Sequence, residues 1–188
     1  MSITTLTNKT ISIALKSLGA ELTSIKGTDQ TEYLWQGNQN FWGGQAPVLF
    51  PIVGSIRNGK ATISGNKTCS FGRHGLARKL EFTLLSSTDT SAVYSLRADE
   101  STKKQYPFDF ELQMIYELID YGVKVTHRVI NHDSIPMPYC VGGHPAFNCP
   151  ISKDESFEDY IVEFEQPETA NCALLDESGL IHNENRVP

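Results

Sequence analysis

The chain has 188 residues and a formal net charge of −6, with 39% hydrophobic and 20% charged residues. This length supports one well-buried core, and the composition is that of a folded soluble domain rather than a disordered chain. Binding along a nucleic-acid backbone requires clustered Lys and Arg. The nearest approach to such a cluster is the short group of Arg73, Arg78 and Lys79. We therefore expect one domain over residues 1–188 and no nucleic-acid partner.

The four cysteines, Cys69, Cys140, Cys149 and Cys172, have no CxxC spacing. They predict reduced thiols rather than a zinc ribbon or a disulfide framework. The first residues contain no basic segment followed by an apolar run, and no stretch approaches the length of a membrane span. We expect a cytoplasmic protein without a membrane partner.

Hydrophobic side chains alternate with a period of two, which is typical of half-buried strands. In chain order the alternation covers 10–15, 80–84, 92–98, 110–118 and 122–131. A turn at 120–122 makes 110–131 a predicted antiparallel hairpin, and a tighter hairpin is predicted around Gly65 and Asn66. Two further strands are predicted at 158–165 and 172–176.

No amphipathic helix of ordinary length is recognisable. Short strands separated by turn residues therefore predict an all-β fold, an antiparallel β-sandwich. The last residues, Val187 and Pro188, follow the final predicted strand with no closing element. We expect the sandwich to be incomplete in this chain, with unpaired strand edges.

Residues 142–148, Gly-Gly-His-Pro-Ala-Phe-Asn, are the most informative segment. His144 follows two glycines and precedes a proline, an arrangement that favours an imidazole open to a small molecule. Because histidine gives and takes a proton near neutral pH, the segment suggests acid–base chemistry.

Two other Gly-rich or Pro-rich segments carry polar side chains. Arg57, in 50–59, offers a planar fork of donors to sugar hydroxyls or a carboxylate, and the alternative is a surface arginine in a turn. His74 lies near two glycines in 71–78, where a solvated, inert histidine is the alternative. His127 falls on the apolar face of a predicted strand and is given no role beyond packing in the core or facing a cleft.

Metal ligands and nucleophiles have little support. Neither a His pair at i,i+4 nor a His-x-His occurs, and Cys140 with His144 is a weak pair. Ser55 and Ser70 lack the sharp turn that presents a catalytic serine. We expect no metal and no cofactor.

Several segments in order resemble the aldose 1-epimerase (galactose mutarotase) family, most closely its LacX-like branch. They are 18–25, Trp42, 47–54, His74-Gly75 and 143–148. The resemblance implies a large antiparallel β-sandwich, the galactose mutarotase-like supersandwich. It also implies metal-independent interconversion of the α and β anomers of an aldohexose such as galactose or glucose.

The same resemblance implies roles for individual residues. His144 would be the general acid at the sugar ring oxygen, and His74 would orient the sugar near it. Arg57 would bind hydroxyls, and Phe147 and Asn148 would contact the substrate, with core packing as the alternative for Phe147.

Two features depart from the family pattern. Ile56 precedes Arg57 where better characterised members have Asn, so that contact does not transfer. The family's catalytic glutamate and a substrate-binding aspartate lie in a later part of a longer chain, and Glu155, Glu158 and Asp159 are not credible equivalents. We therefore expect this chain alone to be weakly active or inactive, unless an oligomeric partner or a complementing segment supplies the base.

Two other functions are compatible with the sequence. A non-catalytic carbohydrate-binding module on the same sandwich would bind sugar through Arg57, His74 and aromatic residues without the glutamate. A metal-dependent β-fold enzyme would contain stoichiometric metal.

Overall fold

The structure, a computed structural model, describes residues 1–63, 66–167, 169 and 172–186, and it is built mainly of antiparallel strands. The strands are β1 (Ile3–Thr7), β2 (Ile11–Lys16), β3 (Glu21–Gly27), β4 (Val48–Leu49), β5 (Lys60–Ile63), β6 (Lys67–Ser70), β7 (Thr83–Ser87), β8 (Ser91–Arg97), β9 (Phe110–Ile119), β10 (Gly122–Asn131), β11 (Gly142–Gly143), β12 (Cys172–Leu175) and β13 (Ile181–Arg186). The short helical elements are α1 (Glu100–Lys103), η1 (Arg57–Gly59), η3 (Ala77–Lys79) and η4 (Phe157–Asp159). No helix among the described residues has the length and apolar character needed to cross a membrane.

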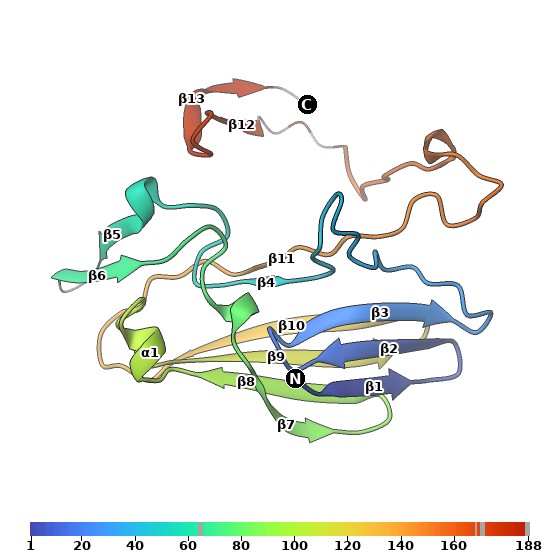
Figure 1. Cartoon of the computed structure of the whole chain (residues 1–188), viewed down its shortest axis with the longest axis horizontal. Coiled ribbons are helices and arrows are strands. Elements are labelled where there is room, and N and C mark those ends of the chain that lie inside the picture. The colour runs from blue at the N-terminus through green and yellow to red at the C-terminus, as the bar shows by residue number, and fades with distance from the viewer. Residues whose placement is uncertain (64–65, 168, 170–171, 187–188) are drawn as a thin grey trace.

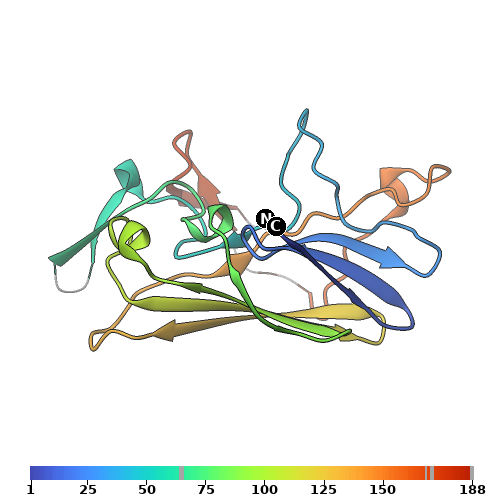
Figure 2. The ribbon, with the colours of Figure 1, turned by 60° about the horizontal axis from the view of Figure 1, so that its bottom comes forward.

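Two sheets form the body of the fold (Figure 1). One has the order β1-β2-β3 and the other β10-β9-β8-β7, and Figure 2 shows them as separate layers. The layers share a hydrophobic core and two hydrogen bonds, from Tyr94 to Thr4 Oγ1 at 2.7 Å and from Tyr116 to the Ala20 carbonyl at 2.6 Å. This arrangement confirms the predicted antiparallel β-sandwich.

The alternating pattern places one face of β2, β8 and β9 in the core. On β2 the buried residues are Ile11, Ile13 and Leu15, and β9 buries Phe110, Leu112, Met114 and Tyr116. The predicted strands at 10–15, 92–98, 110–118 and 122–131 are confirmed. β9 and β10 form the predicted hairpin, in which Ile119 pairs with Gly122 across a two-residue turn.

Two strand predictions need correction. In 80–84 the strand begins only at Thr83, because the Phe82 amide donates to the Ser17 carbonyl at 2.9 Å from a loop that follows η3. The prediction of a strand at 158–165 is wrong: η4 begins the segment and irregular chain follows. Its apolar side chains do not face the core, since Ile161 is 85% exposed and Val162 is 82% exposed.

The remaining strands form three small pairs. β5 pairs with β6, with Ile63 opposite Lys67, as the predicted hairpin requires, although Gly65 itself lies outside the described residues. β4 pairs with β11, and β12 pairs with β13 apart from the two large sheets (Figure 1). The predicted strand at 172–176 is thus confirmed as β12, whereas Val187 and Pro188 lie outside the described residues.

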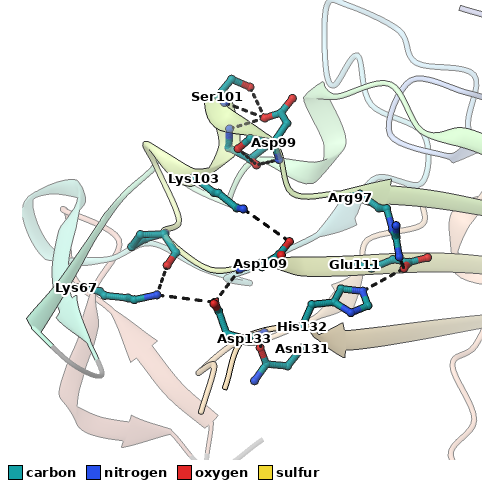
Figure 3. A network of polar contacts seen from close by, with 12 residues as sticks. Lys67, Arg97, Asp99, Ser101, Lys103, Asp109, Glu111, Asn131, His132 and Asp133 are labelled. Atoms are coloured by element: carbon teal, nitrogen blue, oxygen red, sulfur yellow. Dashed lines mark hydrogen bonds and ion pairs between the residues drawn. The ribbon is translucent and has the colours of Figure 1, made fainter. Parts of the chain in front are cut away.

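A buried carboxylate ties the end of β9 to its neighbours (Figure 3). The Glu111 side chain is 8% exposed, and it accepts hydrogen bonds from Gln113, Ser95, Arg97 and His132. These donors, Gln113 foremost, lower the pKa of Glu111 to about 2. Beside it, Lys67 and the Asp109 amide both contact the Asp133 carboxylate.

We expect the substitution Glu111→Gln to lower the free energy of unfolding at pH 7 by about 1–3 kcal/mol, because charged acceptors are replaced by a neutral amide. The pKa of Glu111 is below its ordinary value of 4.5, so this stabilisation is present above pH 4.5 and is lost as pH falls towards 2. Urea unfolding of both proteins between pH 2 and 7 measures the difference.

Glu117→Gln is the matched control, since Glu117 lies on the same strand but is 46% exposed, and among the described residues its ion pair is with the exposed Lys124. Its effect should stay within about 0.5 kcal/mol. Equal losses in the two variants at pH 7 would contradict the role given to Glu111.

Candidate functional site

The short strand β4 brings the segment of His144 into place. Val48 pairs with Gly143 and Leu49 with Gly142, and the His144 amide then donates to the Pro47 carbonyl at 3.1 Å. The approach to β4 is fixed from the first sheet, because the Glu21 carboxylate accepts from the Gln45 and Ala46 amides. His144 therefore follows directly after a paired strand, with its side chain exposed.

The residue after β4, Phe50, brings the segment of His74 to the same place. Its carbonyl accepts from the amides of Leu76 at 2.9 Å and Ala77 at 3.2 Å, and Phe50 also forms a parallel bridge with Gly75. The Phe50 side chain is fully buried. His74 is thus attached to the core through the residues that follow it.

Gly75 is required by this close approach. Its φ is +72°, and a Cβ atom there would lie 2.2 Å from the Phe50 carbonyl oxygen. His74 itself has a φ of +70°, a left-handed conformation that is uncommon for a residue with a side chain. Its amide donates to the Gly54 carbonyl at 2.9 Å. The surrounding contacts hold His74 in this conformation.

The two histidine rings are neighbours in an edge-to-face arrangement. Their centroids are 5.8 Å apart and the ring planes are inclined by 63°. His74 Nδ1 lies 2.5 Å from the Val53 carbonyl oxygen, and because a carbonyl only accepts, Nδ1 carries the proton. In the neutral ring Nε2 is then left as a hydrogen-bond acceptor.

Trp42 forms a wall beside His144, with ring centroids 4.9 Å apart. The Trp35 indole donates to the Trp42 carbonyl at 2.8 Å, and a Cβ atom at Gly44 would lie 2.5 Å from the Trp42 ring. Gly44 thus leaves the space that the indole occupies. Sequence reasoning did not assign Trp42 to the site, although two glycines directly after a tryptophan were a usable signal.

The other predicted site residues lie differently. Arg57 is exposed at the start of η1, and its guanidinium makes no hydrogen bond or ion pair with the described residues. Asn148 uses its side-chain amide to donate to the carbonyls of Glu32 and Leu34. Phe147 lines a separate cavity of about 790 Å³ with Tyr33 and Tyr121. The structure brings His74 and His144 together, and gives neither Phe147 nor Asn148 a contact with them.

The surroundings of the two histidines hold no acidic partner in the described part of the chain. No carboxylate there forms a hydrogen bond or ion pair with His74 or His144, while His132 has such a contact with Glu111. No group of three or more His, Cys, Asp or Glu side chains within the described ranges is arranged to bind a metal. The side chains gathered here are thus two imidazoles, a residue type that can exchange protons near neutral pH, and one indole, which can donate a hydrogen bond.

Comparisons with known proteins agree with this architecture. The sequence model of the aldose 1-epimerase family matches residues 2–177. The chain belongs to the aldose 1-epimerase family. The plasmid-encoded and chromosomal LacX proteins of Lactococcus lactis subsp. lactis are each 39% identical over 189 residues, which cover 97% of this chain and 63% of the relative.

Solved structures of the family share the fold. A galactose mutarotase related enzyme from Lactobacillus acidophilus is 34% identical with a TM-score of 0.93, covering 99% of this chain and 62% of that one. A galactose mutarotase-like protein from Lactobacillus casei is 33% identical with a TM-score of 0.76, covering 81% and 52%. The chain thus spans less than two thirds of the length of these relatives.

We expect Gly75→Ala to lower the free energy of unfolding by more than about 2 kcal/mol, because the added methyl group overlaps the Phe50 carbonyl and the backbone is left-handed. Gly72→Ala is the control, since a Cβ atom at Gly72 meets nothing within 4 Å and its φ is not positive. Chemical denaturation measures both. A Gly75→Ala protein as stable as the control would show that this close approach does not hold the site.

Proposed function

We propose that the chain acts in the interconversion of the α and β anomers of an aldohexose, by ring opening and closure at His144 and His74. The observation that supports this most is the neighbouring pair of imidazoles, brought together from distant segments and open on the His144 side. Membership of the aldose 1-epimerase family supports the same class of reaction.

In this proposal His144 is the general acid. It donates a proton to the ring oxygen while a base removes the proton of the anomeric hydroxyl, so that the bond from C1 to the ring oxygen breaks and a C1 carbonyl forms. Rotation about the C1–C2 bond and closure on the other face reverse both transfers. No electron is gained or lost overall.

His74 orients the sugar. Because the Val53 carbonyl fixes the proton on Nδ1, Nε2 is directed to accept a hydrogen bond from a sugar hydroxyl. Arg57, exposed and without a protein partner among the described residues, is proposed to bind a further hydroxyl from the neighbouring loop. Asn148 supports the site indirectly, by holding the segment after His144 to the chain at Glu32 and Leu34.

The base is the part of this reaction that the described residues do not supply, since no carboxylate there contacts either histidine. We propose that a complementing segment or a second chain provides it. Loss of one member of an acid–base pair typically lowers the rate about 10²–10⁴-fold. The purified chain should accordingly be a poor mutarotase by itself.

We expect polarimetric decay of α-D-galactose and α-D-glucose to be only slightly faster with the purified chain than in buffer, and to accelerate when acetate is added as an external base. Acetate alone catalyses mutarotation, so the quantity to measure is the increment due to the protein at each acetate concentration. His144→Ala should abolish that increment.

His132→Ala is the matched control, because His132 lies on the Glu111 network away from the site and should leave the increment unchanged. A fast reaction without acetate would mean that the chain already contains a base. An increment that survives His144→Ala would show that His144 is not the acid.

A non-catalytic carbohydrate-binding module is the second candidate, and the lack of a carboxylate partner at the described histidines favours it. A binding module of this kind should bind a sugar, which would perturb the NMR signals of His74 and His144, but should cause no mutarotation above that of buffer at any acetate concentration. The acetate series therefore separates the two functions.

A further inference from the structure

His127 lies close to His144, the proposed general acid, and has no part in the reaction described above. It is on β10 opposite Met114, and its Cε1 atom is 4.0 Å from the place where a Cβ atom of Gly143 would lie. The residue after Gly143 is His144, and both histidines line one cavity of about 110 Å³ between β10 and β11. His127 therefore borders the site of His144 from β10.

His127 is a polar side chain in a mainly apolar cavity. The cavity walls include Leu22, Ala46, Met114 and Val125. The His127 imidazole forms no hydrogen bond or ion pair with any residue that the structure describes, in contrast to the rings of His74 and His132. Burial lowers the pKa of His127, so at neutral pH the ring is uncharged and offers one donor and one acceptor.

A half-buried imidazole without a protein partner costs free energy unless water or a ligand satisfies it. The cavity holds a few water-sized groups. It is therefore too small for a sugar ring with its hydroxyls, and large enough for one short arm that carries a hydroxyl. The apolar walls can pack against the carbon of such an arm, and the His127 imidazole can hydrogen-bond its hydroxyl.

We propose that His127 is a specificity-determining residue that hydrogen-bonds the hydroxyl of the exocyclic hydroxymethyl arm of a hexopyranose bound at His144. This inference rests on the proposed sugar site at His144 and His74, and it adds the class of sugar that the site prefers. Gly143 lies between the two histidines, and its missing side chain leaves the cavity open on the side of His127.

The test compares three sugars that differ at one position: D-galactose, D-fucose, which lacks the hydroxyl of the arm, and L-arabinose, which lacks the arm. Dissociation constants for the purified chain are measured by NMR titration of the histidine Cε1 protons, which needs no catalysis. We expect galactose to bind about 3- to 10-fold more tightly than the other two, the worth of one neutral hydrogen bond. Galactose alone should shift the His127 signal.

His127→Leu should weaken galactose binding about 3- to 10-fold and leave L-arabinose binding unchanged, and His127→Gln, which keeps a donor and an acceptor, should restore part of the loss. Thr126→Ala, on the other face of the same strand, is the control and should change neither. Far-ultraviolet circular dichroism and the unfolding midpoint verify that each variant is folded.

The two proposals fail in different ways. In one outcome, galactose shifts the signals of His144 and His74 and yet binds no more tightly than L-arabinose; in another, the His127→Leu variant loses affinity equally for all three sugars. Either result overturns the role of His127 and leaves the sugar site intact. If His127 determines the preference for galactose but no mutarotation is seen in the acetate series, the proposed isomerase activity is overturned and the specificity role of His127 is supported. Binding of none of the three sugars overturns both.

Discussion

The candidate site depends on the hydrogen bonds that the Phe50 carbonyl accepts. This carbonyl receives two amides from the segment after His74, while the strand just before it, β4, holds the segment of His144. Its side chain is buried in the core, so the position of both histidines is set by the packing of the sandwich. The segment of His74 is therefore anchored through the backbone of the buried residues Phe50, Leu76 and Ala77.

The main strands could be predicted from the sequence because each shows one apolar face, as β2 and β9 do. The same rule failed at 158–165, where Val162 and Phe164 alternate with glutamates but no sheet surface covers them within the described residues. Apolar periodicity reports a face that can be buried, and whether a partner buries it depends on contacts far along the chain.

His74 and His144 were recognised in the sequence as separate Gly-flanked histidines, and only the family resemblance implied that they lie near one sugar. The residues alone did not indicate this, because the proximity of the two rings arises from non-local pairing through β4. Trp42 was missed as a neighbour of His144 for the same reason. His127 shows the converse: its position on an apolar strand face was predicted correctly, and only the cavity that it shares with His144 suggests a role. Local pattern identifies candidates, and tertiary contacts select among them.

Because Gly75 lies so close to Phe50 that an added Cβ atom would overlap the Phe50 carbonyl, the order of events during folding is also constrained. The loop that carries His74 completes its contacts with Phe50 only when the chain at β4 is in place, and β4 pairs with β11, which lies much later in the sequence. Contacts of such large sequence separation form slowly, since loop-closure entropy is lost before they contribute stability. On ribosomal synthesis, the two large sheets can therefore assemble while the pair of histidines is still incomplete.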